Sequence, residues 1–412
     1  MKRVAFVSAV PIFPPHGGAR VRILNMIKAV RDLGYNAHLI FLPSRQMGDF
    51  DEEAHFEFFG NTYFHMLRRS KLGDLFYFAR RIYYSILRRW KRLQGRSTPL
   101  WLNVDETYFR AFTKQIREID SRYSFDAVVA EYVTFTRAFE GVSSKAIRIV
   151  DTLDRFVDAL PVDEERRGLS RADAVVAIQD EEARYFKSLL PNRSSVVTTV
   201  SHFIEIADPI PVDICLGATF VGSNFDANRA SILWFLDQVL PLVLKQEPHF
   251  QIVIAGSICD AVPDRAQVRK LGRVERFADA FRDTPVLINP ITSGAGVKTK
   301  LLEAFGSGIP VVSTRLGVEG IAAEYLKATL ISVDDDPQGF ADALVRLMRD
   351  NELRRRFSQL AIDTARAWNS INMEQMSALL ALKTPAGPSL SRPQVLGRED
   401  VSVQGAFADK PA

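Results

Sequence analysis

Short apolar runs alternate with helix-like segments from the start of the chain. Val4 to Val10 form an apolar run that ends at prolines, as a buried strand entering a loop does. After a loop containing Gly17 and Gly18, apolar residues recur at every third or fourth position from Val21 to Leu33, which predicts a helix. A second apolar run follows at residues 37–42. A strand, a glycine loop, a helix and a strand in this order predict the opening of a doubly wound α/β domain.

The alternation stops once and then begins again. Further strands are expected at residues 127–130, 147–150, 174–178, 219–222, 251–255, 271–274, 286–288, 309–313 and 329–333, and further helices at 230–244, 277–281, 340–348 and 354–368. Residues 204–216 contain prolines and lack periodicity, so we interpret them as a linker. The pattern therefore predicts a first domain over 1–203 and a second over 217–383. Residues 384–412 are poor in large apolar side chains and are expected to be disordered.

The stretch Asn289–Gly320 carries the clearest candidate chemistry. A short strand ends at its start, Gly294 and Gly296 allow backbone conformations that a Cβ would forbid, and a helix follows directly. On a helical wheel Lys300 and Glu303 lie together, opposite the apolar side of this helix. A glycine loop that opens a helix presents free N–H groups and a positive dipole end, which suits a phosphate. The stretch is equally compatible with an ordinary strand–loop–helix unit whose Lys/Glu pair is solvated.

Composition excludes several classes of protein. Hydrophobic residues make up 47% of the 412-residue chain and charged residues 25%, as in globular proteins, and no run of about 20 apolar residues predicts a membrane span. The basic, apolar start of the chain lacks a signal-peptide cleavage site and is interpreted as a strand. Cys215 and Cys259 are the only cysteines, which favours a reducing compartment and argues against a zinc or disulfide framework. The first glycine loop lacks the pattern G-x-G-x-x-G, so no nicotinamide or flavin cofactor is expected.

Residues 66–96 hold most of the excess positive charge. They contain ten basic residues and one acidic residue, mixed with large apolar side chains at spacings of three and four. This pattern is typical of a helix lying on an anionic membrane surface. The alternative is a helical hairpin packed on the domain with its arginines solvated. Nucleic-acid binding is the weakest of the three interpretations, because no base-reading motif accompanies the charge.

Two acidic residues follow buried strands of the first domain. Glu131 and Asp151 each end an apolar run, at the edge of a parallel sheet where open α/β folds bind their ligands. Asp151, together with Asp154 and Arg155, could equally cap a loop. The residues leave these two roles open.

The second half of the chain resembles the nucleotide-sugar-binding domain of retaining glycosyltransferases of family 4, which have the two-Rossmann-domain GT-B architecture. The resemblance rests on Phe220–Ser223, Asn228, Trp234–Phe235, Pro241, Ile254–Gly256, Gly272–Val274 and, almost without a break, Pro290–Gly320. It covers about 100 residues and is specific in the last block. The first domain matches less closely, through its P-P-H-G-G loop.

The resemblance implies an enzyme that transfers a sugar from a nucleotide diphosphate donor with retention of configuration and without a bound metal. Glu303 resembles the carboxylate that holds the donor ribose. The expected donor-binding residues are Gly17, Gly18, Gly222, Arg273, Gly294, Ala295, Gly296, Val297, Lys298, Lys300 and Glu303. The expected catalytic residues are Lys300 and His16, the latter being otherwise a loop histidine. No cofactor is implied besides the donor.

Departures from the family pattern keep other functions open. Counting eight residues back from Glu303, where the family often has a second glutamate, gives Ala295. The family's Arg and Lys after the first strand of this domain are also replaced, near Ser223 and Asn228.

The resemblance also implies an acceptor and a location. The acceptor would be a glycan, a lipid-linked sugar or a polysaccharide of the cell envelope, and the enzyme would act in the cytoplasm or at the inner face of the membrane. The alternatives are a catalytically silent nucleotide- or glycan-binding partner protein and a nucleotide-sugar 2-epimerase.

Overall fold

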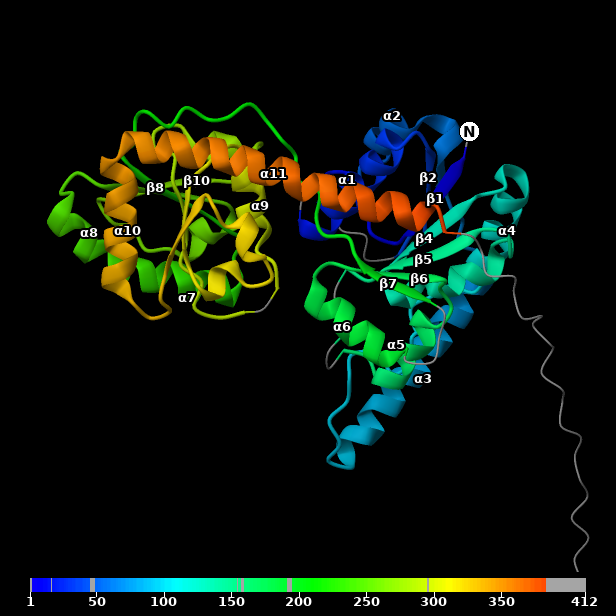
Figure 1. The fold of residues 1–412 in the computed structure, drawn as a ribbon. Coiled ribbons are helices and arrows are strands. Elements are labelled where there is room, and N and C mark those ends of the chain that lie inside the picture. Colours follow the sequence, from blue (N-terminus) through cyan, green and yellow to red (C-terminus); the bar gives the residue numbers. More distant parts are fainter. Residues whose placement is uncertain are drawn as a thin grey trace, which may run out of the picture.

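A computed structural model describes residues 2–15, 17–44, 49–153, 155–156, 159–190, 195–294 and 296–382. It contains two α/β domains with parallel sheets, placed side by side (Figure 1). The tail predicted to be disordered, residues 384–412, lies outside the described residues.

The first domain contains a seven-stranded sheet in the order β3-β2-β1-β4-β5-β6-β7, in which all neighbouring pairs are parallel. Its strands are β1 Arg3–Ser8, β2 Asn36–Phe41, β3 Phe64–Met66, β4 Ala127–Glu131, β5 Ile147–Asp151, β6 Ala174–Ala177 and β7 Val196–Thr199. Its helices are α1 Gly18–Asp32, α2 Glu52–Tyr63, α3 Lys71–Leu93, α4 Ala111–Tyr123, α5 Val162–Leu169 and α6 Asp180–Leu189, with a 3₁₀ segment at Val133–Gly141. In β1, β2, β4, β5 and β6, residues on opposite faces enter two different core clusters, because helices cover both faces of the sheet.

The second domain has a six-stranded parallel sheet in the order β10-β9-β8-β11-β12-β13. Its strands are β8 Gly217–Val221, β9 Gln251–Ala255, β10 Val268–Gly272, β11 Leu287–Asn289, β12 Val311–Thr314 and β13 Thr329–Ser332. Its helices are α7 Asp226–Trp234, α8 Leu240–Gln246, α9 Thr299–Gly306, α10 Pro337–Arg349 and α11 Asn351–Leu380, with a π-helical turn joining α7 to α8. The prediction of two doubly wound parallel sheets is confirmed.

Several elements differ from the sequence-based prediction. The strand expected at 271–274 lies earlier, at β10, and the helix expected at 354–368 is the 30-residue α11. Short or amphipathic elements that were not predicted are α2, β3, α4, α5 and β7. Within residues 66–96 the structure has one helix, α3 at Lys71–Leu93, and not a helical hairpin.

Helix α11 crosses from the second domain to the first (Figure 1, orange). Ala361, Ala365 and Trp368 belong to the core of the second domain, whereas Met376 and Leu379 belong to a core cluster of the first. The segment predicted to be a linker runs beside this helix and packs on α9, where Ala207 N–H donates to Gly306 C=O at 3.0 Å. The helix therefore joins the two domains a second time.

Candidate active site

The glycine loop of the second domain lies at the carboxyl end of β11. Gly294 and Gly296 have φ angles of 97° and 85°, in the left-handed region that favours glycine. At the base of the loop the Asn289 amide donates to Ser313 Oγ (3.0 Å) and to the Gly317 carbonyl (2.9 Å). The N-terminus of α9 has no side-chain cap, so its first N–H groups remain available to a ligand. Ala295, which was predicted to bind the donor, lies outside the described residues.

Lys298 stabilises this loop from within. Its Nζ donates to the carbonyls of Gly296 (2.6 Å) and Gly294 (3.3 Å). Burial lowers the pKa of this lysine, and the charge of Glu319 partly opposes the shift. Lys298 therefore stabilises the conformation of the glycine loop.

Lys300 lies between an amide and an aromatic ring. Its Nζ is 3.1 Å from Asn228 Oδ1 and 4.5 Å from the centroid of the Phe220 ring. Burial and the charge of Lys298 lower the pKa of Lys300 to about 7, although Glu303 opposes the shift. This lysine can exchange its proton near neutral pH.

Glu303 is exposed on α9, one helical turn after Lys300. Enough protein surrounds its side chain, however, for desolvation to raise its pKa to about 7, against the opposing charge of Lys300. Perturbed carboxylate and ammonium groups side by side are typical of a functional site.

Glycines line the sheet edge next to this pair. A Cβ on Gly256 would lie 2.1 Å from the Gly222 carbonyl, and Gly256 N–H donates to the Gly272 carbonyl at 2.6 Å. The residues that end β8, β9 and β10 are therefore packed so closely that Gly256 has no room for a side chain. Arg273 follows at this edge and is exposed; among the described residues it has no polar contact with Lys298 or Lys300.

The first domain contributes the start of α1. Gly17 has a φ of 100°, Gly18 begins the helix, and the helix N-terminus has no side-chain cap. His16 lies outside the described residues, so its predicted catalytic role stays a prediction.

A cavity of about 1060 Å³ connects the two glycine loops and extends to α3. Gly18, Ala19 and Arg22 line it from α1, and Gly296, Val297 and Thr299 line it from the second domain. The remaining wall comes from α3, the segment at 100–109, the starts of α4 and α6, and the segments that follow all seven strands of the first domain. The predicted residues Gly18, Gly296 and Val297 thus share one cavity, whereas Lys300 and Glu303 are not among the residues that line it.

A charged cluster is buried at the ends of β4 and β5. Arg22 donates to both carboxylate oxygens of Asp151, at 2.9 and 2.8 Å, and also to the Val200 carbonyl at 2.8 Å. Burial first, then the charge of Asp151, raises the pKa of Glu131 well above its usual range, and Arg22 opposes this shift only in part. Burial and the charge of Arg22 lower the pKa of His202 to about 3. Two acidic residues were noted in the sequence at the ends of buried strands. Asp151 holds Arg22, a residue of the cavity wall, in place. The raised pKa of Glu131 favours the neutral form of its carboxyl group.

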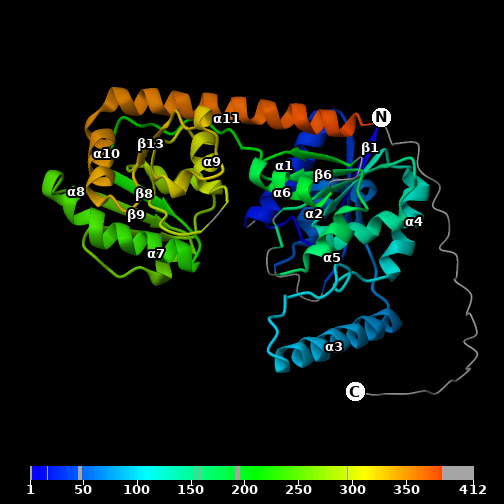
Figure 2. The same ribbon diagram turned by 60° about the horizontal axis from the view of Figure 1, so that its bottom comes forward.

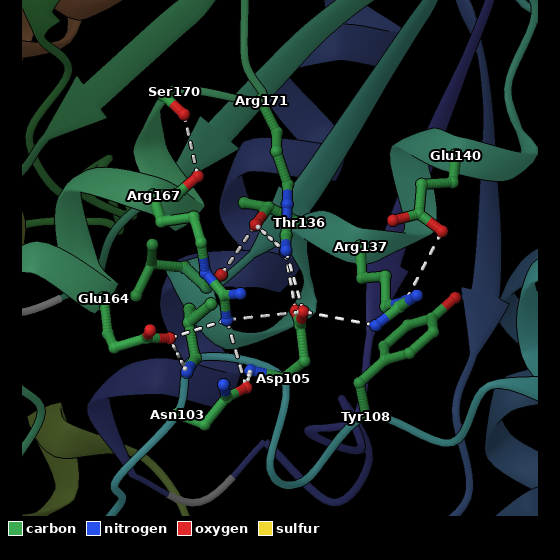
Figure 3. Close-up of polar contacts among 12 residues, drawn as sticks. Asn103, Asp105, Tyr108, Thr136, Arg137, Glu140, Glu164, Arg167, Ser170 and Arg171 are labelled. Carbon is green, nitrogen blue, oxygen red and sulfur yellow. Dashed lines mark hydrogen bonds and ion pairs between the residues drawn. The ribbon is translucent and has the colours of Figure 1, made fainter. Parts of the chain in front are cut away.

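A second cluster holds the 100–109 segment in place (Figure 3). Asp105 accepts from Arg171 at 2.6 and 2.7 Å and from Arg137 at 3.3 Å, and Arg167 lies 3.6 Å away. Burial alone would raise the pKa of Asp105, but the hydrogen bond and the arginine charges outweigh it and lower the pKa. This segment carries Trp101, Glu106 and Phe109 into the cavity wall.

The sequence pattern did not indicate the contacts that position the residues of the cavity wall. Arg22 and Asp151 are 129 positions apart, and Asp105 and Arg171 are 66 apart. Asn228 belongs to a motif, but nothing in its spacing indicated a contact with Lys300. In the described part of the chain, no three His, Cys, Asp or Glu side chains are grouped as they would be around a metal ion, and no helix has the length and hydropathy of a membrane span.

Comparison with known proteins finds a family match within the second domain. Residues 217–350 match the family model for glycosyl transferases group 1. An uncharacterized 44.6 kDa protein in the cps region of Klebsiella pneumoniae is 28% identical over 131 residues, which cover 28% of this chain and 33% of that protein. The chain thus spans about a third of the length of the curated relative it matches.

Solved structures resemble the whole chain. Sucrose-phosphate synthase from Thermosynechococcus elongatus superposes with a TM-score of 0.57 at 14% identity, covering 92% of this chain and 98% of that one. Anabaena Alr3699/HepE, solved with UDP and glucose, superposes with a TM-score of 0.58 at 12% identity, covering 93% and 100%. At such identities the likeness shows the fold, which is the GT-B arrangement predicted from the sequence.

Proposed function

We propose that this protein is a retaining glycosyltransferase that takes a sugar from a nucleotide diphosphate donor without a bound metal. The observation that carries the proposal is the Lys300–Glu303 pair on α9, whose N-terminus has no side-chain cap and directly follows the glycine loop. The GT-B fold and the family match of the second domain support it.

The chemistry follows from these groups. Glu303, when ionised, accepts hydrogen bonds from the ribose hydroxyls of the donor. The N–H groups of the glycine loop and of α9 face the diphosphate, and Lys300 adds a positive charge. As the sugar–phosphate bond breaks, charge develops on the leaving diphosphate, and fixed donors in a site shielded from water stabilise it. The cavity on the other side of the loop holds the acceptor, a glycan or a lipid-linked sugar.

Binding of the donor is testable by thermal shift. UDP, GDP and their sugars are added to the protein, and at least one nucleotide is expected to raise the melting temperature. Glu303→Ala is expected to abolish the rise, whereas Glu374→Ala, an exposed glutamate on α11, is expected to keep it. No stabilisation by any nucleotide, or an unchanged shift in Glu303→Ala, would contradict the proposal.

A catalytically silent binding protein is the second candidate. It is favoured because Lys298 is occupied by its own loop and Lys300 by Asn228, so neither amine is free in the described structure. Incubation with donor sugar and a membrane lipid extract separates the two, because only a transferase releases the nucleotide and forms a product whose anomeric configuration matches the donor. Conversion of the donor itself without acceptor would indicate an epimerase.

We further propose that α3 binds the cytoplasmic face of the membrane. Figure 2 shows α3 as an outlying helix of the first domain. Its solvent side exposes a continuous set of large apolar residues: Leu75, Phe76, Ile82, Tyr83, Ile86, Trp90 and Leu93. Lys71 and Arg89 flank this set, and among the described residues neither has a carboxylate partner. Such a surface suits an anionic bilayer, where apolar side chains enter the interface and cations meet the lipid phosphates.

Vesicle flotation tests the membrane contact. Binding to anionic vesicles is expected, with weakening as salt rises, because the Debye length shortens to about 3 Å at 1 M. Ile86→Glu is expected to abolish it, and the same change at Ile371, an exposed residue of α11, is expected to have no effect. Equal flotation of the wild-type protein and Ile86→Glu would overturn this part of the proposal.

A further inference from the structure

Two carboxyl groups and one cation are buried together at the carboxyl edge of the first-domain sheet. Glu131 ends β4 and Asp151 ends β5, and the two residues are direct partners in the parallel register. The exposed fraction of both acidic residues is 0%, and that of Arg22 is 1%. Arg22 forms its ion pair with Asp151 and none with Glu131. One positive charge therefore serves two buried carboxyl groups.

Glu131 has no partner that could stabilise a negative charge. Neither of its carboxyl oxygens has a hydrogen-bond partner among the described residues, although both oxygens are buried. An ionised carboxylate without partners is very unfavourable in a protein interior, and such a group binds a proton instead. A protonated Glu131 carries an O–H group, and the carboxylate of Asp151 lies in hydrogen-bond contact with it. The proton thus supplies the bond that an ionised Glu131 lacks.

The neighbouring elements bring no second cation to Glu131. Among the described residues, the charged groups that act on it are Asp151 from β5 and Arg22 from α1. The segment after β7 contributes His202, which burial and the charge of Arg22 keep neutral by lowering its pKa to about 3. Burial first, and then the charge of Asp151, favour a proton on Glu131, and only Arg22 opposes it.

The backbone beside this acid pair is strained. Tyr132, which follows Glu131, has a φ of 71°, and Leu153 has a φ of 55°, in the left-handed region that is unfavourable for residues with large side chains. Tyr132 N–H donates to the Asp151 carbonyl at 2.8 Å. Both strained residues line the cavity between the glycine loops. Strain of this kind persists where the surrounding structure fixes it, and it is concentrated at functional sites.

Arg22 connects the acid pair to the cavity wall. It lines the cavity, and it also donates to the Val200 carbonyl at 2.8 Å, two residues before His202, which lines the cavity as well. A second negative charge on Glu131 would compete with Asp151 for Arg22. It would also lie behind the cavity wall between the two glycine loops, where an anionic diphosphate is proposed to bind. A neutral Glu131 avoids both effects.

We propose that Glu131 is protonated at neutral pH, donates its proton in a hydrogen bond to Asp151, and thereby positions Arg22 in the cavity wall. Glu131 is a positioning residue, because it acts through Asp151 and Arg22 and not on a ligand. The buried cluster then contains one cation, one anion and one neutral acid, and has no net charge. This inference goes beyond the proposed function and does not depend on it.

Infrared spectroscopy of the full chain tests the protonation without any ligand. A protonated carboxyl group absorbs at a different frequency from a carboxylate, and at about pH 7 ordinary Asp and Glu side chains are ionised. The wild-type protein is expected to show a protonated-carboxyl band that Glu131→Gln loses. Glu165→Gln is the matched control and is expected to keep the band, because Glu165 is buried in the same domain but accepts from the Tyr185 hydroxyl at 2.6 Å. The contribution of Glu303, whose pKa is about 7, is identified by its loss in Glu303→Gln.

Asp151→Asn separates proton sharing from burial alone. When residue 151 is uncharged, Arg22 becomes the counter-charge of Glu131. Glu131 is therefore expected to ionise and its band to disappear, although Glu131 itself is unchanged. Burial alone would leave the band in place.

Urea unfolding at several pH values gives an independent measurement. The folded protein holds the Glu131 proton more tightly than the unfolded chain does, so ionisation at higher pH favours the unfolded state. From about pH 5 to about pH 8 the wild type is expected to lose stability relative to Glu131→Gln, by up to about tenfold in the unfolding equilibrium constant per pH unit. Glutamine keeps an N–H donor for Asp151, so this variant is expected to fold. Glu165→Gln is expected to follow the wild type.

Several results would overturn the assignment. They are a wild-type protein without the Glu131 band at about pH 7, parallel pH profiles of the wild type and Glu131→Gln, and a band that persists in Asp151→Asn. If Glu131→Gln does not fold, titration of the band in the wild type decides, because a protonated Glu131 has to lose it at alkaline pH. Nucleotide binding with an ionised Glu131 removes this inference and leaves the proposed function intact, whereas a protonated Glu131 without nucleotide binding does the reverse.

Discussion

Lys300 and Glu303 both change protonation state near neutral pH. Burial lowers the pKa of the lysine to about 7 and raises the pKa of the glutamate to about 7. Below this pH the glutamate is protonated and no longer accepts two hydrogen bonds from ribose hydroxyls. Above it the lysine loses the charge that a diphosphate requires. The pair therefore combines an ionised Glu303 with a protonated Lys300, as nucleotide binding requires, only near pH 7.

Nucleotide affinity is therefore expected to be highest near pH 7 and to fall on both sides. Titration of the preferred nucleotide from about pH 5.5 to about pH 9 measures the profile. Glu303→Gln is expected to remove the acidic limb, since the amide does not titrate. It is also expected to move the alkaline limb to lower pH, since Glu303 is what raises the pKa of Lys300.

Glu374→Gln serves as the control for this profile, because that side chain is exposed on α11. A flat profile in the wild-type protein, or an acidic limb that survives in Glu303→Gln, would separate the binding site from these two groups.

The sequence predicted only those site residues that are related to one another over a few positions. Gly294, Gly296 and the one-turn spacing of Lys300 and Glu303 follow from local rules about turns and helices. The bond from Lys300 to Asn228 joins residues 72 positions apart, and the Arg22–Asp151 pair joins different elements of one sheet. Such contacts arise when distant strands are placed side by side, and one sequence carries no record of that placement.

At the scale of elements, α9 is fixed at its end by the linker. A Cβ on Gly306 would lie 2.1 Å from the Glu205 carbonyl, so the linker approaches the helix too closely for any other residue. Gly296 differs, because no atom lies within 4 Å of a Cβ there and only its φ of 85° restricts it.

Gly306→Ala is expected to destabilise the protein by about 2 kcal/mol, since overpacking outweighs the gain of about 1 kcal/mol in helix propensity. Gly296→Ala is expected to cost only about 1 kcal/mol of backbone strain. Urea unfolding of both variants measures the difference. A Gly306→Ala protein as stable as the wild type would mean that the linker does not pack on α9 in solution.

Element types were predicted more reliably than element ends. The mainly apolar runs 251–255 and 127–130 form strands at those positions, because a strand that is buried on both faces needs apolar side chains in succession. The half-exposed strand β10 alternates intermediate and exposed residues, so its position was predicted three residues too late. Helix α11 changes the domain it packs on midway, and its apolar positions therefore follow no single stripe.

At the scale of the whole molecule, α11 joins the domains through hydrogen bonds from its side chains to residues 201–204, the segment that follows β7. Asn369 accepts from Ile204 N–H at 2.8 Å and donates to its carbonyl at 2.7 Å, and Asn372 accepts from Ser201 N–H at 2.7 Å. The indole of Trp368 donates to the His202 carbonyl at 2.7 Å. These bonds tie the segment that contains His202, a residue of the cavity wall, to α11.

Replacement of both Asn369 and Asn372 by alanine is expected to uncouple the domains. The change leaves backbone groups without partners, each costing about 1–3 kcal/mol where they are buried. Calorimetry is expected to resolve two unfolding transitions in place of one, and X-ray scattering to give a larger radius of gyration. Gln359→Ala, on the exposed side of the same helix, is the control. A single unchanged transition in the double variant would show that core packing alone couples the domains.

The return of α11 to the first domain has a consequence for synthesis on the ribosome. Met376, Leu379 and Leu380 are buried against the outer face of the sheet that begins at residue 3. That face therefore stays partly uncovered while the entire second half of the polypeptide is being translated. The nascent chain has to keep this apolar surface from aggregating until residues 376–380 have left the ribosome, so products that stop earlier are expected to aggregate more readily than the full chain.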